Sequence, residues 1–300
     1  MPIVDVVIVT YNRLEKLKKA LACYSNQTVP FRCLIVVDNH STDGTETFLA
    51  SWRKQDTSYE KTVIRLDSNM GGSGGFYAGQ KYALSRNPDW IFLADDDAYP
   101  SVDTMEKFHL FIQQNYKRSY GAICGTVISP QGNICYPHRA YENITKKIYF
   151  EKRSSEANDY EKPFFSIDFF SYVGVFLNAK ALVSVGLVNP SYFIYHDDAE
   201  HSLRLKKFGE IVCVPAITIT HDTWWDPTIQ SQVNKWRDYY FLRNQLHMLL
   251  KHHPLCALNN IRFYIKQMML KRVDVPLYRR AIYDAITNHL GANPDYMPVS

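Results

Sequence analysis

Short runs of apolar, β-branched residues alternate with longer amphipathic segments along the first hundred residues. Residues 3–10 read IVDVVIVT, which is typical of a buried strand, whereas residues 13–27 place three leucines on one face of a helix. Further strands are expected at 33–38, 62–66 and 90–94, with helices from the DGTE segment near residue 43 and from the following glycines through Leu84. This alternation predicts an α/β fold with a mostly parallel central sheet and helices on both faces.

The rest of the chain has a looser pattern. Strands are expected near 121–128 and 170–178, a helix over 179–186, and further helices from about 231, over 258–272 and over 276–290. Between them, residues 131–165 are polar and aromatic without a clear period. We therefore expect either a mobile loop or an excursion over a site in that segment.

Polar side chains follow each of the first four predicted strands. They are Thr10–Arg13, Asp38-Asn39, Asn69 with its glycines, and Asp95–Asp97. Ligands of open α/β sheets bind at the carboxyl ends of the strands, so these four clusters are expected to converge on one site.

The acidic triplet stands at the end of the apolar run in IFLADDDAY. Burying three like charges is costly unless something positive lies beside them. One interpretation is a solvated acidic turn before a helix, and the other is a site for Mg²⁺ or Mn²⁺, which bind through carboxylates and phosphate oxygens. The triplet alone leaves both interpretations open.

Three other segments carry candidate chemistry. The glycines of NMGGSGGF (69–76) fit neither a P-loop nor GxGxxG, but they let a backbone approach a phosphate or sugar closely. The segment HDDAEHSLR (196–204) offers carboxylates that either favour a helix N-terminus or serve as a general base. His221, at a predicted strand end, is either structural or a third metal ligand.

Composition narrows the class of protein. The chain of 300 residues is 46% hydrophobic and has a net charge of +4, which is too weak to indicate nucleic-acid binding. All of that excess lies in residues 251–300, where Lys and Arg are interleaved with aromatic residues.

Six cysteines form no CxxC pair and no signal peptide is evident, so free thiols in a cytoplasmic setting are expected. The most apolar late segment is interrupted by Asn178 and Lys180, so no membrane-spanning helix is expected.

Taken together, these motifs resemble glycosyltransferase family 2, the inverting enzymes with the GT-A fold. VVIVTYNR, VVDNHSTDGT and an acidic triplet after an apolar strand match its N-terminal pattern in order and spacing. NMGGSGGF, LADDDA, HDDAEHSLR, the H-x-x-W from His221 and the later Arg243-Asn244 pair are similar to the bacterial galactofuranosyltransferases. The resemblance implies a GT-A catalytic domain over 1–230 (donor half about 1–120, acceptor half about 121–230) and a C-terminal helical region over 231–300.

The resemblance also implies roles for individual residues. Asp198 would be the general base, with Asp197 and Glu200 contacting the acceptor or orienting groups, and Asp38 would accept from the uracil N–H. A Mn²⁺ or Mg²⁺ ion would be held by Asp95, Asp97 and His221. The implied donor-binding set is Thr10, Tyr11, Asn12, Arg13, Asp38, Asn69, Gly71, Gly72, Ser73, Gly74, Gly75, Asp96 and Trp224. His196 departs from the pattern, because the family often has Trp there.

The function expected from the resemblance is transfer of a hexosyl unit, galactofuranose from UDP-galactofuranose, to a glycan or polyprenyl-diphosphate-linked acceptor of a cell-surface polysaccharide such as O-antigen or capsule. A rhamnosyltransferase that uses dTDP-rhamnose is the alternative within the class. A nucleotidyltransferase is disfavoured because TYNRLEK, not a basic Gly-rich loop, follows the first strand. A non-catalytic sugar-nucleotide-binding subunit is disfavoured by the intact acidic set.

The basic C-terminal helices either simply close over the domain or dock peripherally on an anionic membrane.

Overall fold

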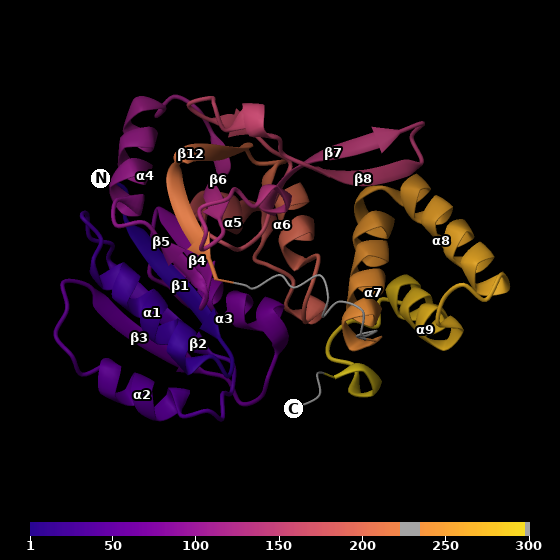
Figure 1. The fold of residues 1–300 in the computed structure, drawn as a ribbon, viewed down its shortest axis with the longest axis horizontal. Helices are drawn as coiled ribbons and strands as arrows, with labels where there is room; N and C mark the ends of the chain where they lie inside the picture. Colours follow the sequence, from indigo (N-terminus) through magenta and orange to yellow (C-terminus); the bar gives the residue numbers. More distant parts are fainter. Residues whose placement is uncertain (223–234, 298–300) are drawn as a thin grey trace.

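The computed structural model describes residues 1–222 and 235–297 and confirms the α/β fold (Figure 1). The strands of the main sheet are β1 (Val4–Thr10), β2 (Cys33–Asp38), β3 (Glu60–Arg65), β4 (Trp90–Asp95), β5 (Ala98–Pro100), β6 (Tyr120–Ile128), β9 (Phe165–Ser166), β11 (Val175–Asn178) and β12 (Glu210–His221). They lie in the order β3-β2-β1-β4-β11-β6-β12-β5, with β9 also paired to β12. The β1–β2, β2–β3, β1–β4 and β6–β12 pairs are parallel, as the sequence predicts for most of the sheet.

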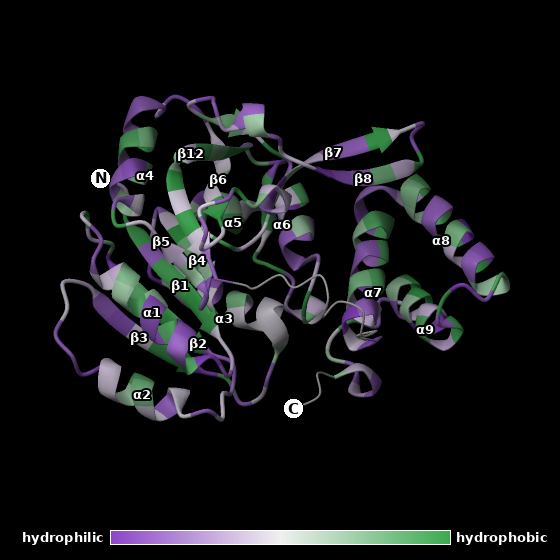
Figure 2. Ribbon diagram, in the orientation of Figure 1, coloured by the Kyte–Doolittle hydropathy of each residue, from purple (hydrophilic) through white to green (hydrophobic). Residues whose placement is uncertain are grey.

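Helices cover both faces of this sheet. On one face lie α1 (Leu14–Ser25), α2 (Thr45–Trp52) and α4 (Thr104–Gln114), and on the other lie α3 (Gly71–Ser85), α5 (Ala179–Val185) and α6 (Asp197–Leu205). Side chains of a strand point alternately to the two faces, so Val6 and Ile8 of β1 join one core and Val7 and Val9 join the other. The apolar central strands are visible in Figure 2.

The segment 131–165, for which the sequence left a loop or an excursion open, contains a regular hairpin. Its strands β7 (Arg139–Thr145) and β8 (Tyr149–Ser154) form a small second sheet with β10 (Phe169–Phe170). Short 3₁₀ turns lie at Tyr136–His138, Ala157–Asp159, Pro190–Tyr192 and Pro294–Tyr296. Because strands of opposite direction need only a tight turn, the hairpin reaches away from the main sheet without a further helix.

The C-terminal region is helical, as expected from its periodicity. Its helices are α7 (Lys235–His252), α8 (Pro254–Met269) and α9 (Val275–Ile286), which pack together beside the hairpin (Figure 1). Helix α8 begins earlier than the sequence pattern suggested, with Pro254 in its first turn, a position that proline favours. In the part of the chain that is described, no helix is both long and apolar enough to cross a bilayer. All six cysteines are free.

Candidate active site

Two strand ends bring an acidic pair and a histidine together. Strand β4 ends at Asp95, and the antiparallel pairing of β12 with β5 sets His221 opposite Ala98, the residue after Asp97. One ligand atom each from Asp95, Asp97 and His221 lies within 4.8 Å of the others. Two carboxylates and an imidazole are a donor set that suits a divalent cation such as Mn²⁺. The three residues proposed from sequence as metal ligands are therefore neighbours in space.

The cluster carries an excess of negative charge, although two basic side chains lie beside it. Arg13 lies 2.8 Å from Asp97 and 3.3 Å from Asp96, and Lys16 lies 3.4 Å from Asp97. Even so, burial and repulsion from Asp97 and Asp96 raise the pKa of Asp95 well above its usual range. Burial likewise raises the pKa of Asp96 to about 6, against the opposing charge of Arg13. A divalent ion would relieve this excess of negative charge.

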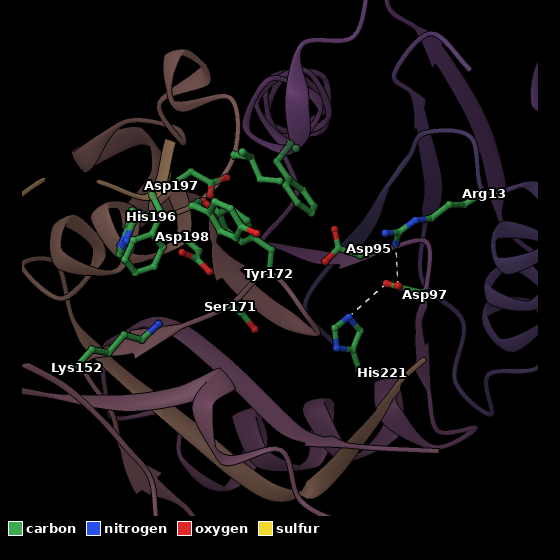
Figure 3. A pocket seen from close by; sticks show the side chains of 15 residues that line it. Arg13, Asp95, Asp97, Lys152, Ser171, Tyr172, His196, Asp197, Asp198 and His221 are labelled. Atoms are coloured by element: carbon green, nitrogen blue, oxygen red, sulfur yellow. Dashed lines mark hydrogen bonds and ion pairs between the residues drawn. The ribbon is translucent and has the colours of Figure 1, made fainter. Parts of the chain in front are cut away.

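A cavity of about 430 Å³ extends from the metal-ligand cluster to the start of α6 (Figure 3). Asp95, Asp97 and His221 lie at one end, and His196, Asp197 and Asp198 lie at the other. The remaining lining residues are Arg13, Gly72, Phe76, Lys152, Ser171, Tyr172, Ile194, Tyr195 and Phe241. The arrangement thus separates an end with a candidate cation site from an end that presents paired carboxylates.

A second cavity, of about 300 Å³, adjoins the first and shares Arg13, Gly72, Asp95 and Ile194 with it. Its other lining residues are Val9, Thr10, Tyr11, Asn39, Asn69, Gly71, Asp96, Phe193, Trp236 and Arg237. Seven residues of the donor set expected from sequence line this cavity, namely Thr10, Tyr11, Arg13, Asn69, Gly71, Gly72 and Asp96. The Thr10 hydroxyl donates to Asp96 over 2.7 Å, which ties β1 to the acidic triplet.

Other residues of the expected donor set lie elsewhere. Asp38, expected to accept from uracil, is buried in an ion pair with Arg65 and accepts from the backbone N–H of Ser41, so its neighbour Asn39 lines the cavity instead. The side-chain oxygen of Asn12 accepts a hydrogen bond from the backbone N–H of Thr42. Gly74 and Gly75 serve packing, because a side chain on Gly75 would meet Val9 of β1 at 2.4 Å.

Ser73 and Trp224 complete the expected donor set. Ser73 is fully buried at the start of α3 and does not line either cavity. It lies close enough to Asp197 to lower the pKa of that carboxyl, although burial dominates. Trp224 lies outside the described residues.

Gly71 is required where α3 begins. Its φ is +70°, and a Cβ there would lie 2.0 Å from the carbonyl oxygen of Phe193. That same oxygen accepts from the backbone N–H of Ser73 over 3.2 Å. Because only glycine permits this contact, the glycine stretch fixes the loop before α6 against the second cavity.

The carboxylates at the far end of the first cavity stand on an irregular turn. Phe193, Tyr195 and His196 all have positive φ angles, which are unfavourable for residues with side chains. Two fully buried residues of α7 hold this turn. Asn244 donates to the carbonyl oxygens of Ile194 and Tyr195, and Arg243 donates to that of Tyr192. The Arg243-Asn244 pair therefore fixes the position of the residues that follow.

The two aspartates that begin α6 both have raised pKa values. Burial and repulsion from Asp198 raise the pKa of Asp197 to about 7. Burial also raises the pKa of Asp198, with the charge of Lys152 as the strongest opposing influence. A carboxylate with a raised pKa beside a cavity is suited to accept a proton from a substrate hydroxyl.

Glu200 was expected to contact the acceptor or orienting groups, and it lies away from both cavities. Its side chain is fully buried, and it lies 2.8 Å from both Arg204 and Lys251 and 3.1 Å from His252. Although burial opposes it, hydrogen bonds from His252 and Arg204 hold the pKa of Glu200 far below its usual range. The reason is helical geometry, because Glu200 turns toward α7 instead of the cavity.

Sequence analysis missed several cavity residues. Lys152 comes from the segment without a clear period, Tyr172 lies between β10 and β11, and Phe241 comes from α7. None of them stands in a recognisable motif. Only the spacing of aromatic residues on α7 could have suggested Phe241 as an exposed ring.

The fold and site together define the GT-A class of nucleotide-diphospho-sugar transferases, in which a mostly parallel sheet carries paired aspartates at its strand ends. The chain belongs to glycosyl transferase family 2, whose family model matches residues 5–175.

Curated relatives and solved structures agree with this assignment. The chain is 28% identical to galactofuranosyltransferase GlfT1 of Mycobacterium tuberculosis strain H37Rv, covering 68% of this chain and 64% of that relative's length. It is 30% identical to abequosyltransferase RfbV of Salmonella typhimurium strain LT2, covering 59% of this chain and 53% of the relative.

Two solved structures share the fold. S. aureus TarS 1-349 in complex with UDP-GlcNAc matches 95% of this chain and 81% of its own, with a TM-score of 0.58 at 16% identity. Mannosyltransferase PcManGT from Pyrobaculum calidifontis, in complex with GDP-Man and Mn²⁺, matches 95% and 75%, with a TM-score of 0.57 at 15% identity.

Proposed function

We propose that this protein is an inverting, metal-dependent glycosyltransferase that moves a hexosyl unit from a nucleotide-diphosphate sugar to an acceptor hydroxyl. The observation that carries the proposal is the single cavity that joins Asp95, Asp97 and His221 at one end to Asp198 at the other. This arrangement offers a place for a diphosphate and its cation opposite a place for a base.

The reaction requires one displacement. Asp198 takes the proton of the acceptor hydroxyl, the hydroxyl oxygen attacks the anomeric carbon, and the bond between that carbon and the diphosphate oxygen breaks. The nucleoside diphosphate leaves with the bonding electron pair, and the configuration inverts because attack comes from the opposite face. Mn²⁺ or Mg²⁺ held by Asp95, Asp97 and His221 would neutralise the charge on the departing diphosphate.

The favoured donor is UDP-galactofuranose. Support comes from the similarity to GlfT1, which extends over 206 aligned residues, together with the order of the NMGGSGGF, DDD and HDD motifs. The similarity to an abequosyltransferase supports deoxyhexose donors, including dTDP-rhamnose, as the alternative. The side chains of the donor cavity do not by themselves distinguish uracil from thymine.

We also propose that the acceptor is a glycan or polyprenyl-diphosphate-linked intermediate of a cell-surface polysaccharide, met at the cytoplasmic face of a membrane. Helix α8 supports this proposal, since it exposes Leu255, Leu258 and Met269 beside Arg262 and Lys266. Apolar and basic side chains on one exposed helix suit peripheral contact with anionic lipid.

A donor panel tests the proposed function. Purified protein is offered UDP-galactofuranose, UDP-galactopyranose, UDP-glucose and dTDP-rhamnose with alkyl glycoside acceptors and Mn²⁺ or Mg²⁺, and product is measured by mass spectrometry. We expect transfer from UDP-galactofuranose, loss of transfer with a chelator, and loss in Asp198→Asn with UDP binding retained. Transfer by Asp198→Asn at the wild-type rate would refute the base assignment.

A further inference from the structure

The β7–β8 hairpin brings a lysine to the end of the cavity that faces the base. Lys152 of β8 is exposed at the cavity mouth, on the side of Asp198 and away from Asp95, Asp97 and His221 (Figure 3). It is a cation that neither the family motifs nor the metal-ligand cluster includes. Its position suggests contact with the acceptor and not with the donor.

The hairpin is anchored firmly enough to fix this position. Arg139, at the start of β7, is fully buried and donates to the backbone carbonyl oxygens of Gly125 (2.8 Å) and Val173 (2.8 Å). On β8, Phe150 lies two residues before Lys152 and packs against Phe169, with ring centroids 6.0 Å apart. Because strand side chains alternate, the face of β8 on which Phe150 is partly buried also directs Lys152 toward the cavity.

The charge of Lys152 is not neutralised by its cross-strand neighbour. Glu142 is paired with Lys152 in register but forms ion pairs with Lys206 (3.5 Å) and His253 instead. Within the described residues, no carboxylate forms an ion pair with Lys152; its Nζ lies 5.7 Å from the ring centroid of Phe169. This positive charge also opposes the burial that raises the pKa of Asp198.

Aromatic side chains also line this end of the cavity. Phe241 of α7 is 48% exposed, and its ring centroid lies 4.6 Å from that of His196 and 6.0 Å from that of Tyr195. Nε2 of His196 is buried without a hydrogen-bond partner among the described residues. Burial lowers the pKa of His196 to about 3, so the ring is neutral and can pack against a sugar.

We propose that this end of the cavity binds an anionic acceptor, with Lys152 contacting a phosphate or carboxylate close to the attacked hydroxyl and Phe241 contacting the sugar ring. The inference rests on the proposed function and adds the chemical class of the acceptor. The anionic group belongs either to a phosphate or diphosphate that links the sugar to a lipid, or to a uronic acid of the glycan. An ammonium group attracts either one as a compact point charge.

Kinetics with matched acceptors test the proposal. Three alkyl glycosides of the same sugar are compared: one neutral, one bearing a phosphodiester and one bearing a uronic carboxylate. We expect wild type to prefer an anionic acceptor and Lys152→Met to lower the ratio of its kcat/KM to that of the neutral acceptor by about tenfold or more, chiefly through KM. The preferred anionic acceptor identifies the source of the charge.

Lys147→Met is the control, because Lys147 is exposed at the turn of the same hairpin and does not line the cavity. It removes the same charge and should leave the ratio unchanged. An equal fall in kcat/KM for all three acceptors in Lys152→Met would overturn the proposal, since Lys152 would then act only on the base. An unchanged ratio would overturn it as well.

A second measurement does not depend on the donor. Protein saturated with UDP and Mg²⁺ is acylated briefly with acetic anhydride, and labelling of each lysine is followed by mass spectrometry as inorganic phosphate or glucuronate is added. We expect one of these anions to protect Lys152 and not Lys147. Protection without turnover on any donor would count against the proposed function alone, whereas equal labelling of both lysines at every concentration would overturn the acceptor proposal.

Discussion

The side-chain amide of Asn244 lies 2.9 Å from the carbonyl oxygen of Tyr195, two residues before the first aspartate of α6. Asn244 belongs to α7, so a C-terminal helix holds the turn that presents Asp197 and Asp198. Its neighbour Arg243 donates to the Asn244 side-chain oxygen over 2.9 Å, which orients the amide. The C-terminal helices therefore complete the site and do not simply follow it.

Replacing Asn244 should disturb this turn. Asn244→Ala leaves the carbonyl oxygens of Ile194 and Tyr195 without their side-chain donor, and an unpaired buried group costs about 1–3 kcal/mol. We expect the free energy of unfolding to fall by about 2 kcal/mol or more and kcat to fall at least about tenfold under conditions where the variant is folded. Chemical denaturation and steady-state kinetics check this, with Asn259→Ala of α8 as the control. Wild-type values for Asn244→Ala would contradict it.

Adjacent glycines offer a matched pair of substitutions. Gly71 has a φ of +70° and a Cβ there would lie 2.0 Å from a backbone oxygen, whereas nothing lies within 4 Å of a Cβ at Gly72. Gly71→Ala should lower the free energy of unfolding by at least about 2 kcal/mol, since strain and overpacking add. Gly72→Ala should change it by less than about 0.5 kcal/mol. Equal stability of the two variants in urea denaturation would show that the contact with Phe193 is not restrictive.

Glu200 makes the stability of the protein pH-dependent. Hydrogen bonds from His252 and Arg204, outweighing burial, hold its pKa below that of the unfolded chain, so its stabilisation is complete above about pH 4.3 and is lost as pH falls below that value. Glu200→Gln should lower the free energy of unfolding by about 3 kcal/mol near pH 7, because it leaves the largely buried Arg204 guanidinium without its carboxylate partner. The difference from wild type should shrink toward pH 3.

Urea denaturation of both proteins across this pH range measures that difference. Glu156→Gln is the control, since Glu156 is exposed and its nearest cation, Arg153, lies 3.8 Å away. A constant difference between wild type and Glu200→Gln from pH 7 to pH 3 would contradict the ion-pair interpretation.

Much of the fold was predictable because its signals are local. The apolar runs that form β1, β2 and β4 are buried on both faces, and leucine spacing predicted α1. The hairpin was not predictable because β8 has the exposed sequence YFEKRS, whose alternation is hidden by charged residues on both faces. Its stability comes from Arg139, which binds backbone oxygens distant in sequence.

The candidate site, too, was predictable where the signals are local and not where they depend on contacts distant in sequence. Asp95, Asp97 and His221 were predicted as a group, because strand ends and motif order place them together, and they are neighbours. Asp38 was expected at the uracil and Glu200 at the acceptor or orienting groups, but each is buried beside a cation from outside the motifs, Arg65 for the first and Lys251 for the second. Tertiary ion pairs of this kind leave no local trace in a sequence. The roles of all these residues stay predictions.

Activity should fall at acidic pH. Burial raises the pKa of Asp198 above that of an ordinary aspartate, about 3.9, and protonation of this carboxylate removes the base. With donor and metal saturating, kcat/KM for the acceptor should therefore fall as pH is lowered, with an inflection above pH 4. A pH–rate profile that is flat down to pH 4 in wild type would contradict the base assignment.

Helix α8 should bind anionic membranes. Leu255, Leu258, Ile265 and Met269 recur at helical spacing and are exposed, Met269 by 79%. Arg262 stands within the same stripe, so a second copy packed antiparallel there would oppose like charges, whereas an anionic lipid surface would neutralise them.

We expect binding to phosphatidylserine vesicles that weakens with salt, measured by sedimentation, and no binding to neutral phosphatidylcholine vesicles. Met269→Glu should weaken binding by about tenfold, because it replaces an apolar side chain that would enter the lipid with a negative charge that the lipid repels. Ile286→Glu on α9, where the side chain is 56% exposed, is the matched control and should bind like wild type. Equal binding of Met269→Glu and wild type at low salt would place any membrane contact elsewhere on the protein, since α8 would then contribute nothing to it.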